Sequence, residues 1–202
     1  MGAGIIPFCV NEKKVHFLLH KTFSGRRAGY LVDFGGSGHD GETYRQTAVR
    51  EFVEETDTMF LASDLSQARR TPARITAQIP IMDALLGRTL DVHPDWWCQR
   101  APGSKIPPKD WRTFFVEVEH RDIDGINAQW AGDDGSRFKK PRELLWVPGD
   151  ELVAIIDTAP ERLWKRVRQL LGARETVEAI LTAREFSPQV SDSSAETSKS
   201  GS

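Results

Sequence analysis

The sequence predicts a single domain of the α/β class. Its 202 residues, 39% of them hydrophobic, can bury one good core but hardly two. Apolar runs rich in β-branched residues, which are typical of strands, are interspersed with segments whose apolar residues recur at helical spacing. This order fits helices packed on a sheet, although it also allows other α+β layouts.

The N-terminal part is expected to form a hairpin and a third strand. The apolar runs IIPFCV and VHFLLH flank the polar NEKK, and Pro7 favours an edge strand or a bulge in the first run. TFSGRRAG is predicted to be a loop, and YLVDF a short strand that leads directly into Gly35 and Gly36. We therefore expect a strand, a glycine-rich turn and then a helix.

The helix after this turn is predicted to run from Thr43 to about Thr56. Thr43 and Gln46 have the spacing of a capping box, which starts a helix. At about 100° per residue, one stripe of the helix is apolar and carries Ala48, Val49, Phe52 and Val53. A separate stripe carries Glu51, Glu54 and Glu55. One face of the helix is therefore expected to join the core, and the other is a cluster of carboxylates.

Residues 61–108 are expected to be an irregular insertion or a lid. They contain six prolines, although ARITAQIPIMDALLG is compatible with a short helix. Beyond them, WRTFFVEVEH alternates as a half-buried strand does, residues 125–135 are a loop rich in Gly and Asp, and ELLWVP is another strand.

The last apolar segment, residues 160–186, is predicted to be helical, with two segments that meet near Gly172. It is expected to cover one face of the sheet. Residues 187–202 lack aromatic residues and are mostly small and polar, so we expect a disordered tail. The folded domain is thus expected to cover residues 1–186.

Composition and charge argue against several classes of partner and location. The formal net charge of −2, from 27 basic and 29 acidic residues, gives no general attraction to nucleic acid or to an anionic membrane. No stretch approaches the roughly 20 apolar residues of a membrane span, and the first residues lack the basic flank of a secretory signal. Cys9 and Cys98 form neither a disulfide framework nor a zinc cluster, which fits a reducing compartment. We expect a soluble, cytoplasmic protein, with the nucleus or another intracellular compartment left open.

The three glutamates carry the functional prediction. Like charges at i,i+3 or i,i+4 cost about 0.2–0.5 kcal/mol per pair in an isolated helix, and a bound cation reverses that cost. Carboxylate oxygens without Cys or His alongside favour a hard ion, Mg²⁺ or Mn²⁺, and Mg²⁺ commonly pairs with substrate phosphates. The preceding glycines let the backbone approach the same ion or the phosphates. The sequence therefore predicts a metal site for a polyphosphate, with a solvated acidic helix face as the alternative.

The segment from Gly36 to Thr58 resembles the Nudix box, G-x5-E-x7-R-E-U-x-E-E-x-G-U, in which U is an apolar residue. Gly36 is followed by Glu42 and by REFVEE, residues 50–55, at the positions that the box specifies. Two positions depart, because Asp57 and Thr58 stand where the box has glycine and an apolar residue. Aspartate adopts the left-handed conformation at modest cost, so we expect a slightly altered helix end.

This resemblance implies a fold and an activity. Nudix hydrolases are α/β/α sandwiches with a mixed central β-sheet, which here would have the box helix on one side and the C-terminal helix on the other. They cleave the diphosphate linkage of nucleoside diphosphate derivatives by attack of metal-activated water. The implied substrate is a small molecule such as ADP-ribose, a nucleotide sugar or a dinucleoside polyphosphate, and the implied cofactor is Mg²⁺ or Mn²⁺. A homodimer is left open.

The resemblance also assigns roles to single residues. The positions that match the family's metal-binding and catalytic groups are Gly36, Glu51, Glu54 and Glu55. Glu51 and Glu55 match the main metal ligands, and Glu54 matches a further ligand or the group that activates water. A backbone carbonyl at Gly35 or Gly36 joins them. Glu42 and Arg50 match a structural pair, in which Arg50 orients the carboxylates.

Residues outside the box are candidates for the remaining roles. If the general base is not Glu54, the candidates are Glu143, Glu117 and Glu119. Arg26 and Arg27 lie just before the strand that enters the box, where they reach phosphates or belong to a solvated loop.

Two basic stretches and two other classes of protein complete the set of hypotheses. RRTPAR, residues 69–74, and KKPR, residues 139–142, offer contacts to an RNA backbone, which makes a capped RNA a less favoured substrate. The alternatives to an enzyme are a non-catalytic module that binds nucleotide or RNA and a metal-stabilised scaffold without a substrate. The intact glutamates of the box argue against both.

Overall fold

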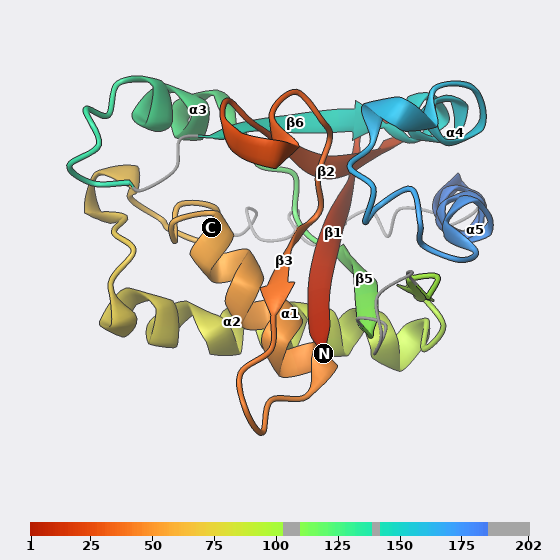
Figure 1. Ribbon diagram of the computed structural model, residues 1–202, viewed down its shortest axis with the longest axis horizontal. Helices are drawn as coiled ribbons and strands as arrows, with labels where there is room; N and C mark the ends of the chain where they lie inside the picture. The colour runs from red at the N-terminus through yellow and green to blue at the C-terminus, as the bar shows by residue number, and fades with distance from the viewer. Residues whose placement is uncertain (103–109, 139–141, 186–202) are drawn as a thin grey trace, which may run out of the picture.

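A mixed, six-stranded sheet forms the centre of the computed structural model, which describes residues 1–102, 110–138 and 142–185 (Figure 1). The strands are β1 (Gly2–Asn11), β2 (Lys14–Thr22), β3 (Phe34–Ser37), β4 (Trp97–Gln99), β5 (Trp111–Glu117) and β6 (Arg142–Pro148). Their order is β4-β5-β1-β2-β6, and β3 pairs with the first part of β1 beside this path. β1 and β5 run parallel, whereas the other paired strands are antiparallel.

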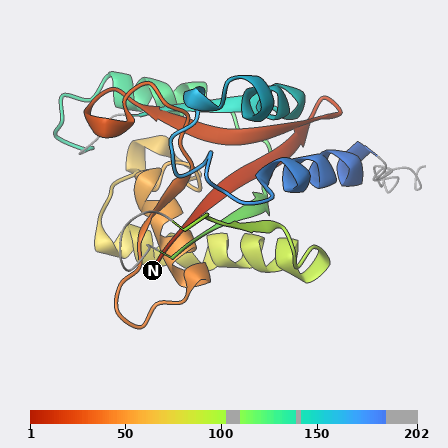
Figure 2. The same cartoon turned by 45° about the vertical axis from the view of Figure 1, so that its right-hand side comes forward.

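Helices cover both faces of this sheet. They are α1 (Tyr44–Glu55), α2 (Pro72–Val92), α3 (Asp124–Ala131), α4 (Gly149–Thr158) and α5 (Ala173–Glu185). One hydrophobic cluster joins the sheet to α1, α2 and α3, and a second joins it to α4 and α5. Figure 2 shows α2 along the bottom of the molecule and α4 along the top, with β1 and β2 between them. The predicted mixed sheet between two helical layers, with the C-terminal helix opposite the box helix, is therefore confirmed.

The predicted N-terminal hairpin is confirmed, but β1 is not an edge strand. On one side it pairs with β5 throughout its first part. On the other side residues 2–5 pair with β3 and residues 8–11 pair with β2, so Pro7 falls between the two antiparallel ladders. Proline has no N–H to donate, and at this position neither β2 nor β3 requires a donor from β1.

The third strand begins later than predicted. Leu31 and Val32 make only isolated bridges, and the regular strand starts at Phe34 and includes both glycines that were expected to form a turn. A Cβ on Gly35 would lie 2.4 Å from the carbonyl oxygen of Ala3 in β1. Glycine is therefore needed here for the close approach of two strands rather than for a turn.

The prediction of an irregular segment over residues 61–108 is wrong, because α2 takes up 21 of these residues. Thr71 caps the helix by accepting from the Arg74 N–H, and Pro72 occupies a first-turn position that suits proline. Pro80 lies inside the helix. The helix persists because Met82, among other residues, packs it against α1 and β5, so that tertiary burial outweighs the local cost of proline.

The loop predicted over residues 125–135 is also partly wrong, because α3 occupies its first half. Ile126 and Trp130 of α3 are buried in the cluster that contains α1. Two apolar residues four positions apart are a weak periodic signal, and the surrounding Gly and Asp residues obscured it.

Only part of the predicted C-terminal helix is helical, namely the 3-10 turn Pro160–Arg162 and α5. Between them the chain pairs with Leu31, whose N–H donates to the Arg162 carbonyl at 2.9 Å and whose carbonyl accepts from Trp164 at 2.8 Å. Leu163, Val167 and Leu170 are buried as expected, but in a segment of turns rather than a helix, and Leu171 is exposed. α5 starts directly after Gly172, where φ is +71°, so the predicted break is confirmed.

Two further sequence predictions concern the C-terminal tail and the absence of a membrane span. The predicted tail, residues 187–202, lies outside the described residues. Within those residues, no helix combines the length and the apolar character that a membrane crossing requires.

Candidate functional site

The helix that carries the glutamates is built as the sequence predicts. The Thr43 side chain accepts from the Gln46 N–H at 3.2 Å, and the Gln46 side chain accepts from the Thr43 N–H at 2.9 Å, so both arms of the capping box are present. The apolar stripe of α1, with Phe52 at its centre, is fully buried against the sheet. This fixes the rotation of the helix and directs the opposite stripe toward β3 and the loops around it.

The end of α1 explains the departure from the box at Asp57 and Thr58. Both residues have positive φ, 49° and 62°. The Thr58 N–H donates to the Val53 carbonyl and the Asp57 N–H donates to the Glu54 carbonyl, at 3.0 and 3.1 Å, which is a Schellman motif without glycine. The Asp57 side chain accepts from Trp130 Nε1 at 2.9 Å. This hydrogen bond offsets the cost of the left-handed conformation that was expected for Asp57.

From the middle of α1, the Arg50 side chain reaches back to the loop that precedes the helix. Its Nε donates to Glu42 Oε1 at 2.7 Å and its Nη2 donates to Glu42 Oε2 at 3.0 Å. Nη2 also donates to the Ser37 carbonyl at 2.9 Å. The hydrogen bonds from Arg50 hold the pKa of the Glu42 carboxyl at about 2, below its ordinary range. Glu42 and Arg50 thus form a rigid clamp between β3 and the helix.

Glu51 and Gly36 lie in direct contact. A Cβ on Gly36 would stand 2.2 Å from the carboxyl carbon of Glu51, so only glycine leaves room for this carboxylate beside the backbone of β3. Burial, the neighbouring charge of Glu55 and that of Glu54 raise the pKa of Glu51, while Arg50 opposes the shift. The structure therefore crowds carboxylates against a glycine backbone in a partly buried place.

Each of the other two glutamates is bound by an arginine from a distant segment. Glu54 accepts from Arg70 Nη2 at 2.8 Å. Glu55 accepts from the Gly35 N–H at 2.7 Å and from Arg142 Nη2 at 3.2 Å. Its Oε1 also lies 3.6 Å from Arg27 Nη1. The acidic stripe is thus surrounded by cationic groups.

The donor chemistry of this stripe suits a hard divalent ion, because it consists of carboxylate oxygens and a closely approaching backbone. Gly36 has no side chain, and a Cβ there would collide with Glu51. The backbone next to this carboxylate is therefore open to such an ion. In the part of the chain that the structure describes, no group of three or more His, Cys, Asp or Glu side chains is already arranged around a single point. The carboxylates are paired with arginines instead, so binding an ion would require them to turn toward one another.

The structure separates the other predicted site residues. Arg27 lies at the cluster, whereas Arg26 is exposed on the same 3-10 turn. Glu143 follows Arg142 in β6, and because successive strand residues face opposite sides, it points away from the face that carries α1. The alternation thus places Glu143 on the face opposite Arg142, and its role as a base stays a prediction.

Glu117 and Glu119 lie elsewhere as well. Both line a cleft of about 840 Å³ between α2 and the end of β5, and Glu117 pairs with Arg184 of α5. Of the proposed bases, Glu54 is the one that the fold places in the cluster.

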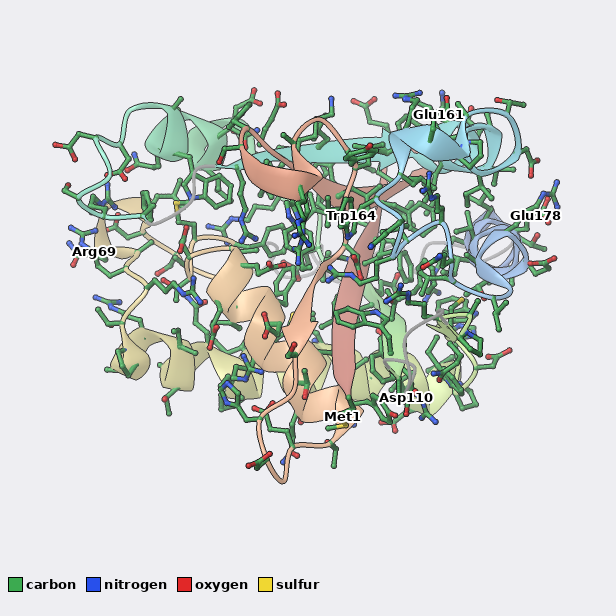
Figure 3. The ribbon with its side chains drawn as sticks, in the orientation of Figure 1. Met1, Arg69, Asp110, Glu161, Trp164 and Glu178 are labelled. Atoms are coloured by element: carbon green, nitrogen blue, oxygen red, sulfur yellow. The ribbon has the colours of Figure 1, made fainter. Side chains whose placement is uncertain are left out.

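Sequence reasoning missed the arginines that surround the glutamates. Arg70 and Arg142 belong to the two basic stretches that were considered for RNA, yet both bind carboxylates of the box helix. Figure 3 shows Arg69, the first residue of one stretch, at the periphery of the molecule. No signal in the sequence identified these pairs, because which arginine reaches which glutamate depends on the fold.

A third missed arginine, Arg166, forms a buried ion pair with Asp33. Arg166 Nη2 lies 2.6 Å from Asp33 Oδ1, and the guanidinium stacks 4.1 Å from the ring centre of Trp111. Nη1 donates to the Gly35 carbonyl at 3.1 Å. Asp33 is fully buried and was visible in the sequence as the one charged residue of YLVDF. The pair fixes the backbone next to Glu55.

Comparison with known proteins gives similarities of backbone alone. No protein-family model and no curated protein matches the sequence. Among solved structures, a binary complex of a C. elegans Ap4A hydrolase is 16% identical, with 90% of this chain and 97% of that chain covered and a TM-score of 0.49. A NUDIX hydrolase from Alicyclobacillus acidocaldarius is 14% identical, with 91% of each chain covered and a TM-score of 0.45. NrtR from Shewanella oneidensis is 12% identical, with 91% and 64% covered and a TM-score of 0.42.

Proposed function

We propose that this protein is a divalent-metal-dependent pyrophosphohydrolase that cleaves the diphosphate linkage of a nucleoside diphosphate derivative. The proposal is supported by the order of the Nudix box residues in the sequence and by the close approach of Glu51 to the backbone of Gly36. The single observation that carries it is the contact between Gly36 and Glu51, where the backbone leaves room for a carboxylate and for nothing larger than hydrogen. A structural turn or a solvated helix face requires no such contact.

The residues of the chain take distinct roles in this proposal. Glu51 and Glu55 hold the divalent ion, Mg²⁺ or Mn²⁺, and Glu54 either joins them or accepts the proton of the attacking water. When bound, the ion neutralises charge on the phosphate oxygens and lowers the pKa of water. Arg50 orients Glu51 and Glu54, because its Nη1 lies 3.1 Å from Glu51 Oε1 and 3.4 Å from Glu54 Oε1. Arg27 binds a substrate phosphate.

The products would be a nucleoside monophosphate and a second phosphorylated compound. Water attacks one phosphorus, the bridging oxygen leaves with the other phosphate, and the proton of the water passes to the base. ADP-ribose, a nucleotide sugar, a dinucleoside polyphosphate and a capped RNA all contain the required linkage. These substrates share the diphosphate, and the box residues would contact only that part of the molecule.

A second candidate is a non-catalytic module that binds nucleotide or RNA. The observation that favours it is the pairing of Glu54 and Glu55 with Arg70 and Arg142, which leaves each carboxylate with a cation supplied by the chain. In such a module the arginines would be the binding groups and the carboxylates would merely hold them in place.

A substrate panel with Mg²⁺ or Mn²⁺ tests the first proposal against the second. We expect release of nucleoside monophosphate by the wild type, and a rate lower by about 10²- to 10⁴-fold for Glu54→Gln and Glu55→Gln, because a ligand or base is lost. Glu161→Gln is the matched control, since Glu161 is exposed on the 3-10 turn before the C-terminal segment and lies at the top of Figure 3.

Equal release by the box variants and the control would reject the catalytic role of the glutamates. Nucleotide binding without turnover, in the wild type and in the variants alike, would favour the binding module.

A further inference from the structure

Arg70 belongs to the basic stretch of residues 69–74, which the proposed reaction does not use. Its guanidinium binds the box helix through one hydrogen bond, in which Nη2 donates to Glu54 Oε2 at 2.8 Å. Within residues 1–102, 110–138 and 142–185, no other hydrogen bond or ion pair of this side chain is found. The Arg70 side chain is 33% exposed, and that of Glu54 is 18% exposed. Arg70 is therefore a cation at the edge of the proposed metal site, held there by a single contact.

The backbone on both sides of Arg70 is fixed. The Thr58 hydroxyl donates to the Arg69 carbonyl at 3.1 Å and accepts from the Arg69 N–H at 3.2 Å. The Thr58 carbonyl accepts from Gln78 Nε2 of α2 at 2.8 Å. On the other side of Arg70, Thr71 caps α2. Thr58 is one of the two positions at which this chain departs from the box, so the departure anchors the segment that carries Arg70.

Glu54 is shared between two arginines that are held to different degrees. Its Oε1 lies 3.4 Å from Arg50 Nη1, and its Oε2 accepts from Arg70. Arg50 is 10% exposed, and its guanidinium also binds Glu42 and Glu51. A divalent ion that binds Glu54 competes with one of these two arginines. Arg70 is the one that gives way, because a single, partly exposed ion pair contributes little stability, whereas Arg50 has several partners to lose.

We propose that Arg70 is an exchangeable partner of Glu54, which it leaves when a divalent ion binds, and that it then binds a phosphate group of the substrate. The anchored backbone keeps the freed guanidinium beside the site. There it meets the negatively charged oxygens of the diphosphate, two of which a guanidinium binds at once. The inference rests on the proposed function, since it takes Glu54 to be a ligand of the ion.

Binding of Mn²⁺ alone, followed by calorimetry, tests the exchange without turnover. Arg70→Gln removes the competing charge, so Mn²⁺ is expected to bind about two- to fivefold more tightly than to the wild type, the factor that corresponds to a partly exposed ion pair. Arg74→Gln is the matched control, since Arg74 is an exposed arginine of the same basic stretch and its substitution changes the net charge equally. An equal change in both variants would show only a long-range effect of charge. That result, or no change in either variant, would overturn the exchange.

Binding of inorganic pyrophosphate tests the phosphate contact. With Mn²⁺ in excess, Arg70→Gln is expected to weaken pyrophosphate binding about three- to tenfold, because a charge-assisted hydrogen bond is lost. This change is opposite in sign to that for Mn²⁺ alone, a result that unfolding of the variant does not produce. In EDTA, where Arg70 stays on Glu54, Arg70→Gln and Arg74→Gln are expected to bind pyrophosphate equally well. Unchanged affinity in Mn²⁺, or a loss specific to Arg70→Gln in EDTA, would overturn the proposal.

The same titrations distinguish this proposal from the proposed function. Mn²⁺ binding that Glu54→Gln weakens, but that Arg70→Gln and Arg74→Gln change alike, would support the metal site and reject the exchange. Mn²⁺ binding that Glu54→Gln leaves unchanged would reject Glu54 as a ligand of the ion, and the exchange with it.

Discussion

Two groups of arginines and carboxylates lie along α1 and are arranged in opposite ways. In the first, Arg50 binds Glu42, Glu51 and the Ser37 carbonyl, all within a short stretch of sequence. At the C-terminal end, Glu55 is met by Arg27 and Arg142, which come from segments on either side of the box. The first group is local and the second is assembled by the sheet.

The two groups also differ in how completely they are satisfied. Each nitrogen of the Arg50 guanidinium has a carboxylate or carbonyl partner. Glu55 is instead shared between Arg142 and Arg27, and 34% of the Arg27 side chain is exposed. A closed set of contacts suits a structural clamp, whereas an open one suits ligand binding. The difference is consistent with the proposal that Glu55, rather than the Glu42–Arg50 pair, belongs to a binding site.

The largest effect is expected from the ion pair that supports the C-terminal end. Arg166→Leu removes the ion pair of the fully buried Asp33 carboxylate and keeps its hydrogen bond from Thr113. We expect a loss of about 3–5 kcal/mol in the free energy of unfolding, measured by urea denaturation. Arg168→Leu, on an exposed neighbour, should change it by less than about 0.5 kcal/mol. Similar small losses in both variants would show that this pair does not hold the assembled end together.

A smaller and pH-dependent effect is expected at the N-terminal clamp. Arg50 holds the pKa of Glu42 at about 2, against an ordinary value of 4.5. Because the folded pKa is depressed, the contribution of Glu42 is fully present above about pH 4.5 and is lost as the pH falls toward 2. Glu42→Gln should cost about 1.5–3 kcal/mol at pH 7, and this deficit should shrink below pH 4.

Denaturation of the wild type and Glu42→Gln across this pH range measures the effect. A deficit that is the same at pH 7 and at pH 3 would mean that the charge of Glu42 is not what stabilises the clamp.

The smallest effect is expected at the cap of the same end. Thr43→Ala removes the side-chain acceptor of the Gln46 N–H. The expected cost is about 1 kcal/mol, seen as a small drop in the urea midpoint. Thr43→Ser keeps the hydroxyl and should restore most of the stability. Pyrophosphate affinity should be the same in both variants, because the cap contributes to the local end of the helix alone; a change in affinity would contradict the separation of the two ends.

The sequence determined the parts of this site that depend on neighbours in the chain. The capping box, the apolar stripe of α1, the row of three glutamates and the left-handed Asp57 all follow from residues within a few positions of one another. Hydrogen bonds and side-chain contacts in a helix join residues at most four apart, so their pattern can be read directly. The hairpin of β1 and β2 could also be predicted, because its two strands follow one another directly in the chain.

The tertiary structure alone decided what surrounds the glutamates. Arg142 reaches Glu55 through the register of β6, and Arg166 reaches Gly35 from the segment before α5, which the sequence had predicted to be a helix. α2 likewise exists because burial against α1 and β5 outweighs Pro80. Such contacts join residues far apart in the chain, and their register is set by how the whole hydrophobic core packs, which a local pattern does not specify.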